Sequence, residues 1–412
     1  MSSGGYVPAA PVLSGTFVTP ETALGVAALF CAVNVISRDI AVMPRAVYRR
    51  LPGGGREIDR SLPVHDLISV QPNDDMNSQR WMQSEMCHVL TRGNGLNEIV
   101  RNKRNGEPVE IHVLHPAKTY PKRTESGQLY YELENKKKLL PEDCLHFAGM
   151  GFDGIMGYCP VTVCRQTVGL TMGAEQYGAA FFGNSARTGG WIKVARRMSE
   201  GALNSLRRSF NQIHQGSQSA HQVGILEEGM DWVNAQFSPE DAQFLATRAF
   251  QVLDIARMYG IPPHKLCDYS QAHLANVEQS NLEYVAMTLL GWVVMLESEM
   301  NCKLLTREQR QTHEIGLDMS VLLRADTAAR MARVQTLRNT GAISADEIRI
   351  SEGMNPIGPD RGGDKYLVQA QYIPLDQVGK IPPKPTKTSD DRAAFPGLEE
   401  RINGSYINGA AA

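Results

Sequence analysis

The sequence lacks the features of a disulfide-bonded secreted domain and of a membrane protein. Its seven cysteines stand singly with no C-x-x-C pair, which indicates free thiols in a reducing compartment. The most apolar run, residues 285–296, is only twelve residues long, whereas a helix needs about 20 apolar residues to cross a bilayer. The first residues are rich in glycine and serine and lack an apolar segment, so we expect neither a secretory signal nor a membrane partner.

Charge and catalytic motifs are equally sparse. The 42 basic and 44 acidic residues leave a net charge of −2, which argues against a high-affinity nucleic-acid binder. The glycine pair in residues 93–95 follows no strand and precedes no Lys-Ser/Thr pair, so it predicts a helix stop and not a phosphate loop. There is also no nucleophile elbow and no pair of carboxylates at catalytic spacing. We therefore expect no enzymatic activity and no cofactor.

Two pairs of residues come closest to the spacing of a metal site. Cys159 and Cys164 are explained better by helical packing than by zinc. His112 and His115 straddle the end of a predicted strand just before a proline, where ordinary strand-edge histidines are common. We predict no metal.

The order of predicted elements indicates an α+β fold. Thr19 and Pro20 begin a helix that ends before Pro44, and Asn77 or Ser78 caps a second helix. The first of these helices has one face made of Leu24, Ala28, Cys31 and Val35. Ser344 and Glu347 form a capping box before a short helix late in the chain. Strands at 97–101, 108–114, 119–123 and 130–133, with Asn-Gly and Ser-Gly turns, predict a small antiparallel sheet. Helices and hairpins mix without βαβ alternation, which favours α+β over a parallel α/β fold.

The chain is organised around residues 238–305. Ser238 and Pro239 begin a helix that runs to Tyr259, and Gly260 with Pro262-Pro263 ends it. A polar loop and a second long apolar helix follow. That helix is predicted for about 275–305, with one apolar face made of Leu282, Val285, Leu289, Val293, Leu296 and Met300. Residues spaced by four and three place one row on a single face of the first helix, where neighbouring helices can approach closely: Ala242, Ala246, Ala249, Leu253 and Ala256.

Short motifs in a fixed order resemble the portal proteins of tailed double-stranded DNA bacteriophages, in the smaller branch typical of long-tailed phages. The similarity spans roughly residues 20–370, and Cys159 stands where serine is usual in the family. The motifs are residues 31–37 (CAVNVIS), 71–73 (QPN), 92–95 (RGNG), 98–101 (EIVR), 114–116 (LHP), 146–147 (HF), 153–160 (DGIMGYCP), 181–184 (FFGN), 225–230 (ILEEGM), 255–263 (IARMYGIPP) and 323–326 (LRAD).

The resemblance implies a ring, usually of twelve subunits, around a central channel, with wing, stem, clip and small crown regions. The implied divisions are a disordered arm 1–18, wing 19–196, stem helix 197–215, clip 216–238, stem helix 239–260, channel loop 261–277, long wing helix and return 278–322, crown-like helices 323–373 and a flexible tail 374–412. The alanine-rich row would then pack between subunits, because a ring closes through head-to-tail contacts.

The resemblance also implies how the channel meets DNA. The channel loop would present Asp268, Tyr269, Ser270, Gln271, His273 and Asn276. That loop is polar and has no lysine or arginine beyond Lys265, which suits a conduit that must not hold phosphates. Without the resemblance, an ordinary solvated loop explains the same residues. Arg207, Arg208 and Arg248 are candidates for DNA contacts or for salt bridges between subunits, and the sequence leaves the two open.

The function implied is a portal at one capsid vertex of the virion, through which double-stranded DNA is packaged and ejected. The implied partners are further copies of the chain, the terminase large subunit, a head–tail adaptor, the major capsid protein, a scaffold and transiently bound DNA, with assembly in the host cytoplasm. The alternative is another ring-forming head–tail connector. An enzyme is the third class, and the missing motifs weigh against it.

Overall fold

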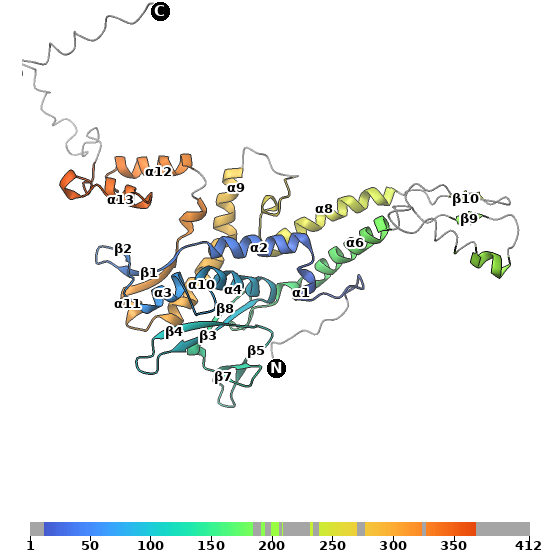
Figure 1. The fold of residues 1–412 in the computed structure, drawn as a ribbon, viewed down its shortest axis with the longest axis horizontal. Coiled ribbons are helices and arrows are strands. Elements are labelled where there is room, and N and C mark those ends of the chain that lie inside the picture. Colours follow the sequence, from blue (N-terminus) through green and yellow to red (C-terminus); the bar gives the residue numbers. More distant parts are fainter. Residues whose placement is uncertain are drawn as a thin grey trace, which may run out of the picture. The chain divides into compact units, whose positions relative to one another are not determined.

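The computed structural model describes residues 12–183, 191–193, 199–205, 208, 231–233, 239–269, 277–323 and 327–367. The chain divides into two compact units, residues 1–325 and 326–412. Each unit is treated separately below, and Figure 1 shows the ribbon of the whole chain.

The first unit contains both helices and strands. Its helices are α1 (Pro20–Ala23), α2 (Ala27–Ala41), α3 (Pro63–Ser69), α4 (Ser78–Arg92), α5 (Pro160–Val163), α6 (Arg165–Gly183), α8 (Pro239–Tyr259), α9 (Val277–Glu283), α10 (Leu290–Leu304) and α11 (Gln309–Thr312). Shorter turns of helix are η1 (Pro141–Asp143), η3 (Pro263–Leu266) and η6 (Met319–Leu323), and η5 (Tyr284–Leu289) is π-helical.

The strands form small antiparallel sheets. They are β1 (Arg45–Arg50), β2 (Arg56–Ile58), β3 (Asn94–Arg101), β4 (Pro108–Leu114), β5 (Thr119–Arg123), β6 (Leu129–Leu133), β7 (Lys138–Leu139), β8 (Cys144–Ala148), β9 (Trp191–Lys193), β10 (Asp231–Val233) and β11 (His313–Leu317). The sheet orders are β11-β1-β2, β4-β3-β8, β5-β6-β7 and β10-β9. The predicted strands are all present, but they divide between two three-stranded sheets instead of forming one.

Helix α4 lies at the centre of the first unit. It packs along α2 and against β3, and Trp81, Met82 and Met86 on it are fully buried. The Trp81 indole N–H donates to the Asn97 Oδ1 at 2.8 Å, so the one polar atom of this side chain is paired inside the core. Asn77 caps the helix by accepting the backbone N–H of Arg80, as the sequence predicts.

The first predicted helix is two helices in the structure. Thr19 caps α1 as expected, and Thr22 completes a reciprocal capping box with it. Helix α1 ends at Ala23 because the chain turns at Gly25, whose N–H donates to the Thr22 carbonyl. Leu24 is therefore 37% exposed, although the sequence predicts that it shares the buried face. The buried face of α2 consists instead of Leu29, Ala32, Val33, Ile36 and Ile40.

Residues 12–18 belong to the segment for which the sequence predicts disorder, yet they make defined contacts. Val12 and Val18 are buried, and the Leu13 N–H donates to the Gln166 Oε1 at 3.1 Å. This short segment lies against α6, and we call it the strap.

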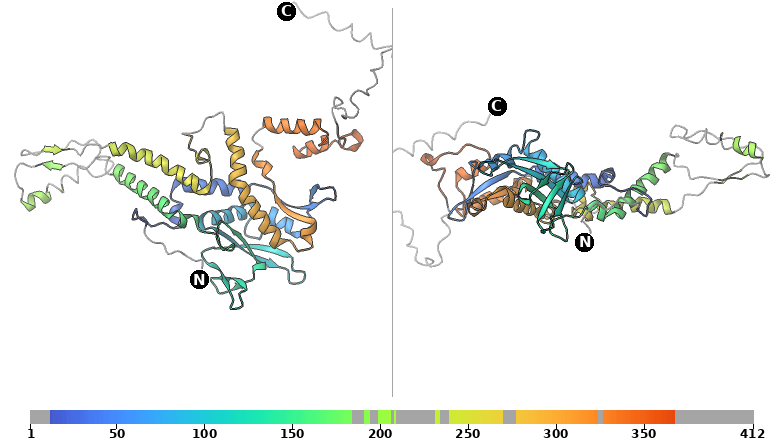
Figure 2. Two further views of the ribbon diagram at one scale, coloured as in Figure 1. Left: turned by 180° about the vertical axis from the view of Figure 1, so that it is seen from behind. Right: turned by 90° about the horizontal axis from the view of Figure 1, so that it is seen from below.

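The two long helices that pair are α6 and α8. They contact each other, and the views in Figure 2 show them side by side. The resemblance instead implies a stem of residues 197–215 with α8, and within that span residues 200–205 and 208 are helical. Strand β9, which precedes that helical segment, pairs with β10 after it through Trp191 and Val233. The helical segment thus lies between the two strands of a hairpin-like pair that separates α6 from α8 in sequence.

The long helix predicted for about 275–305 is interrupted. The π-helical η5 separates α9 from α10, and one extra residue per turn there rotates the faces of the two α-helices relative to each other. Leu289, Val293 and Met300 are buried as expected, whereas Leu282, before the interruption, is 46% exposed. Figure 1 shows α9 and α10 as successive parts of one rod.

The second unit holds α12 (Thr327–Asn339), α13 (Ala345–Ser351) and η7 (Pro359–Arg361). The predicted capping box of Ser344 and Glu347 is present at the start of α13. Asp346 accepts the backbone N–H groups of Ile357 and Gly358, which ties the following loop to the helix. Gly341 has φ of +72°, as expected for a helix stop.

Candidate functional site

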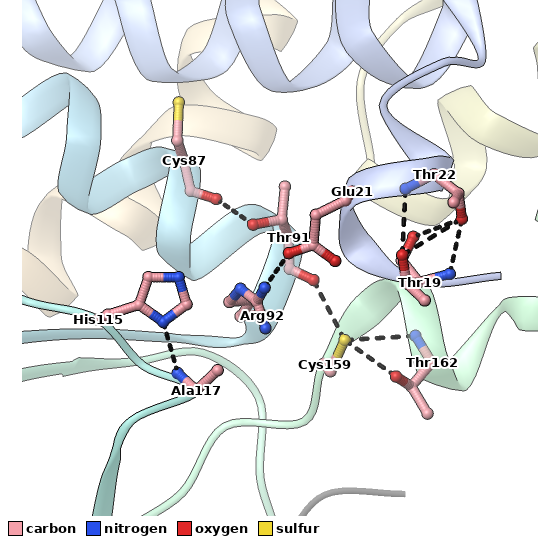
Figure 3. Close-up of polar contacts among 10 residues, drawn as sticks. All are labelled: Thr19, Glu21, Thr22, Cys87, Thr91, Arg92, His115, Ala117, Cys159 and Thr162. Carbon is pink, nitrogen blue, oxygen red and sulfur yellow. Dashed lines mark hydrogen bonds and ion pairs between the residues drawn. The ribbon is translucent and has the colours of Figure 1, made fainter. Parts of the chain in front are cut away.

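The carboxyl end of α4 carries the base of the α6–α8 pair. The last carbonyls of a helix have no partner within it and must be satisfied from outside. The Leu90 carbonyl accepts the Tyr259 hydroxyl at 3.1 Å. The Thr91 carbonyl accepts the Cys159 thiol at 3.1 Å, as Figure 3 shows. Tyr259 ends α8 and Cys159 precedes α5 and α6, so both arms of the pair are fixed to one helix end.

Cys159 does the work of a helix cap. Its sulfur accepts from the Thr162 N–H at 3.4 Å and from the Thr162 hydroxyl at 3.1 Å (Figure 3). An oxygen-bearing side chain is the usual residue at this position of a helix. Cysteine at position 159, where serine is usual in the family, therefore keeps the capping contact. Its sulfur is larger than the serine oxygen and forms weaker hydrogen bonds.

An ion pair joins α1 to the same helix end. The Arg92 guanidinium on α4 bonds the Glu21 carboxylate (Figure 3). Partial burial opposes ionisation of Glu21, but hydrogen bonding and the charge of Arg92 outweigh it and lower the pKa of Glu21. His115 lies beside this junction, directly after strand β4. Its ring accepts the backbone N–H of Ala117 at 3.1 Å, and this contact within the turn helps to end the strand.

The predicted helix stop at Gly93 is confirmed and is also a site of close backbone packing. Gly93 has φ of +81°, and a Cβ built there would lie 2.1 Å from the Tyr158 carbonyl oxygen. Asn94 then clamps the opposite loop, because its side chain donates to the Gly157 carbonyl and accepts the Gly157 N–H, each at 2.8 Å. These contacts join the end of α4 to the loop before α5.

The α6–α8 pair places one of the predicted arginines. Arg248 on α8 lies 3.8 Å from Glu175 on α6, and its side chain is 46% exposed. This contact lies within one chain, and the exposed guanidinium keeps the predicted DNA or inter-subunit contact open. Arg208 is exposed and helical, while Arg207 lies outside the described residues.

The alanine-rich row on α8 changes environment along its length. Ala256, at its carboxyl end, is only 3% exposed and packs in the core of the first unit. Leu253 is half-buried, and Ala249 is exposed. The side chains of Ala242 and Ala246 lie outside the described residues. Ala256 therefore belongs to the chain's own core, and only the earlier part of the row is left for an interface between subunits.

Helix α8 has a well-defined end, from which the following loop leaves the core. Gly260 adopts φ of +60°, and the Ile261 N–H donates to the Ala256 carbonyl at 3.0 Å, which closes the helix end. Thr288 in the π-helical segment donates to the Gly260 carbonyl. The first turn of the loop is thus fixed to η5.

The predicted channel residues are described in part. Asp268 follows Cys267, which has φ of +61°, and Tyr269 is 60% exposed. Ser270, Gln271, His273 and Asn276 lie outside the described residues.

The basic residue nearest the loop is turned toward the protein. The Lys265 ammonium lies 4.6 Å from the centre of the Tyr284 ring, and the Tyr284 hydroxyl donates to the Asp39 Oδ2 at 3.1 Å. Burial lowers the pKa of Lys265 and raises the pKa of Tyr284. This cluster joins η3, η5 and α2 and engages the one basic residue of the predicted channel loop.

The described residues contain no group of three or more histidine, cysteine, aspartate or glutamate side chains that could hold a metal ion. His112 is bonded to the Glu110 carboxylate at 2.7 Å, two residues away on the same strand. No helix of the described chain combines the length and apolarity needed to span a bilayer.

Sequence reasoning missed three of the residues that hold this site. Tyr259, Asp39 and Thr288 make contacts across 28 to 245 positions of sequence. The one available signal was polarity: Asp39 and Thr288 interrupt otherwise apolar faces, and buried polar groups need partners.

Comparisons with known proteins agree on one family. The family described as phage portal protein matches residues 27–353. The chain is 30% identical over 383 residues to a probable portal protein of Streptomyces phage phiC31, covering 90% of this chain and 82% of that one. It is 25% identical over 384 residues to the portal protein of Enterobacteria phage HK97, covering 92% and 89%.

Solved structures show the same fold at lower identity. An HK97-family phage portal protein from Corynebacterium diphtheriae superposes with a TM-score of 0.57 at 16% identity, covering 75% of this chain and 97% of that one. A chain from the neck of a native gene transfer agent particle, computed with C12 symmetry, gives a TM-score of 0.53 at 22% identity, covering 86% and 97%.

Proposed function

This chain belongs to the phage portal protein family, and from that premise we propose that it forms a ring at one vertex of a capsid. Double-stranded DNA enters and leaves through the centre of this ring. A structural neighbour taken from a particle neck with C12 symmetry supports a ring of twelve copies. The ring is a component of the virion and assembles in the host cytoplasm.

The observation that carries this proposal is the two-helix arm fixed to one helix end. Helices α6 and α8 run side by side, and α4 holds both at their bases through Thr91 and Leu90. We assign α6 and α8 as the stem, in place of residues 197–215 with α8. The chain between them, which includes the β9–β10 pair, becomes the clip.

The loop after α8 suits a channel that lets DNA slide. Each lysine or arginine that neutralises a phosphate adds sequence-independent affinity and slows DNA passage. Residues 266–276 contain neither, and Lys265 is engaged with the Tyr284 ring. Asp268 and Tyr269 then begin a loop that can contact DNA without binding it tightly.

The proposed partners follow from the regions of the ring. The clip is the docking site for the terminase large subunit during packaging and for the head–tail adaptor afterwards. The wing contacts the major capsid protein, with a scaffold during assembly. The ring itself hydrolyses no ATP in this account, because the packaging motor supplies that chemistry.

The native mass of the purified chain, together with negative-stain images of the same sample, tests the proposal. We expect closed rings of about twelve copies with a central hole, as cyclic assemblies bury complementary surfaces on every subunit. A stable dimer or tetramer without a channel contradicts it. ATP hydrolysis by the purified ring contradicts the proposed division of labour with the motor.

A further inference from the structure

The stretch formed by η5 and the start of α10 carries no charged residue between Glu283 and Glu297. A helix that is apolar all round is typically buried on every side, because a helix face that meets water carries charged or polar residues. One side of this stretch is buried in the core of the first unit through Leu289, Val293 and Leu296. Its other side has the composition of a buried face but is exposed in the single chain.

Large apolar side chains line the exposed side of this stretch. Met287 is 84% exposed, Val294 is 52% exposed and Leu290 is 45% exposed. They follow one another at steps of three and four residues, which places them together on one side of a helix. We call Met287, Leu290, Gly291 and Val294 the α10 face.

Gly291 lies among these side chains, and the fold of the single chain does not require a glycine there. A Cβ built at Gly291 would meet no atom of the described residues within 4 Å, and its φ is not positive. Glycine is nevertheless one of the least favourable residues inside a helix. The missing side chain leaves a hollow between larger neighbours, which is the kind of surface that receives a side chain of a second helix.

Glycines on α6 show how such a position looks when its occupant belongs to the same chain. A Cβ built at Gly169 would lie 2.3 Å from the Val12 Cγ2 of the strap, and one at Gly173 would lie 3.4 Å from the Ser14 Cβ. The Ser14 hydroxyl also donates to the Gly169 carbonyl at 2.9 Å. The hollow over Gly291 has no such occupant from the part of the chain that the structure describes.

Helix α2 exposes a second face, on the other side of the first unit. Helix α2 packs on α4 and α8, whereas α10 packs on β8 and β11. Figure 1 shows α2 in front of α10, and the left panel of Figure 2, seen from behind, shows α10 in front of α2. The exposed row of α2 and its C-cap, which we call the α2 face, consists of Phe30, Asn34, Arg38 and Val42.

The chemistry of the α2 face suits packing on an apolar surface. Phe30 is 55% exposed and Val42 is 40% exposed, so both ends of the row are apolar. The Arg38 guanidinium between them is bonded to the Asp39 Oδ1 at 3.0 Å, so covering this face would bury no unpaired charge. Aromatic residues such as Phe30 are enriched at the cores of protein interfaces.

We propose that the α2 face of one copy packs on the α10 face of the next copy in the ring, with a side chain of α2 seated over Gly291. This inference rests on the proposed ring and adds to it a pair of surfaces that meet. The two faces differ and lie on opposite sides of the subunit, so the contact is head-to-tail, as a closed ring requires. The structural neighbour from a neck with C12 symmetry supports a second copy as the occupant.

A charge placed on the α10 face tests whether a neighbouring copy covers it. Met287→Arg should abolish closed rings, because the new charge would be buried without a partner between copies. The melting temperature of the chain should stay within a few degrees, since Met287 is 84% exposed in the single chain. Native mass, negative-stain images and thermal unfolding measure these effects. Full rings from Met287→Arg overturn the inference.

Met150→Arg is the matched control, because Met150 is 78% exposed and lies outside both faces. It should form rings as the wild type does. Loss of rings from both variants alike would show that the α10 face has no specific role and would also overturn the inference.

Cysteine cross-linking tests which surface meets the α10 face. In a chain whose exposed Cys267 and Cys302 are replaced by serine, one variant carries Asn34→Cys and another carries Leu290→Cys. Rings assembled from both variants are treated with a flexible bismaleimide and run on a denaturing gel. We expect a covalent dimer from the mixture and none from either variant alone.

A control mixture replaces the Asn34→Cys chain by an Asn105→Cys chain, because Asn105 is also exposed but lies in the turn between β3 and β4. This mixture should give no dimer. Rings that form normally but give no dimer in the Asn34–Leu290 mixture overturn the inference alone. A wild-type chain that makes no ring removes the proposed function as well, so the two failures are distinguishable.

The hollow over Gly291 gives a third test, which depends neither on charge nor on cysteine chemistry. Gly291→Leu should abolish rings by filling the hollow, without lowering the melting temperature of the chain, because leucine favours a helix more than glycine does. Gly53→Leu changes an exposed turn glycine that also has open space around it, and it should assemble normally. Normal ring yield from Gly291→Leu contradicts the proposed seat.

Discussion

The core around α4 and the α6–α8 arm differ in how they bury apolar side chains. In the core, Trp81, Leu29 and Ile36 are fully buried within one chain. On the arm, Leu170 and Phe250 are more than half exposed. Helices of this length draw most of their stability from packing of an apolar face. The core is therefore complete in one copy, whereas the arm leaves large apolar side chains exposed, which the neighbours in the proposed ring would cover.

The largest expected effect comes from a substitution in the core around α4. Trp81→Ala removes a fully buried indole and leaves the Asn97 side chain without its donor, so we expect a loss of about 3–5 kcal/mol in the free energy of unfolding. Urea unfolding followed by circular dichroism measures it. Phe152→Ala is the control, since Phe152 is 86% exposed and should change stability by no more than about 0.5 kcal/mol.

The second prediction compares a buried and an exposed alanine of the alanine-rich row on α8. Ala256→Arg places an unpaired charge in the core and should cost about 3 kcal/mol or more in the stability of the isolated chain. Ala249→Arg changes an exposed residue, so it should leave that stability within about 0.5 kcal/mol and block ring formation instead. Thermal unfolding and native mass separate the two. Full rings from Ala249→Arg would remove the alanine row from the interface.

The third prediction concerns a titratable group inside the core. Glu85 on α4 is fully buried, neither of its carboxylate oxygens has a hydrogen-bond partner, and burial raises its pKa well above 4.5. The folded chain then holds a proton that the unfolded chain releases, so stability falls as pH rises from 4.5 to the folded-state pKa. Its slope is about 1.4 kcal/mol per pH unit.

Glu85→Gln should remove that slope, so its stability advantage over the wild type should grow with pH above 4.5. Comparing the two chains cancels the contribution of neighbouring His88, whose pKa is lowered to about 4 by burial and nearby positive groups. Urea unfolding at several pH values measures the difference. A pH-independent difference would show that Glu85 ionises normally in the folded chain.

The smallest expected effect comes from a substitution at the contact between the core and the α6–α8 arm. Tyr259→Phe removes the hydroxyl that satisfies the Leu90 carbonyl, so we expect a loss of about 1–2 kcal/mol. Tyr158→Phe serves as the matched control, because Tyr158 is 44% exposed and should be neutral within the error of thermal unfolding. A Tyr259→Phe variant as stable as the wild type would mean that the buried hydroxyl adds no stability.

Local signals in the sequence predicted the boundaries of many elements. Asn77 and Ser344 cap helices, and Gly93 and Gly260 stop them, because these contacts involve residues only a few positions apart. The strands around the Asn-Gly and Ser-Gly turns followed from period-two patterns. These interactions are local, so a single sequence contains all the information they need.

Long-range pairings were not predictable in the same way. Residues 199–215 and 165–183 both have helical patterns, and nothing local shows which of them lies along α8. The Gly169 and Gly173 pair was visible in the sequence, but its occupant, the strap, lies more than 150 positions away. The buried and the exposed parts of the alanine-rich row on α8 also look the same in the sequence, because alanine is suited to a core and to an interface.

Amide hydrogen exchange on the isolated chain and on the assembled ring tests most directly that the core is complete alone and the arm is not. Leu170→Arg, which should not assemble, supplies the isolated chain. We predict that α4 exchanges slowly in both forms, while α6 and α8 exchange quickly in the isolated chain and slowly in the ring. Equal protection of α6 and α8 in the two forms would contradict the account.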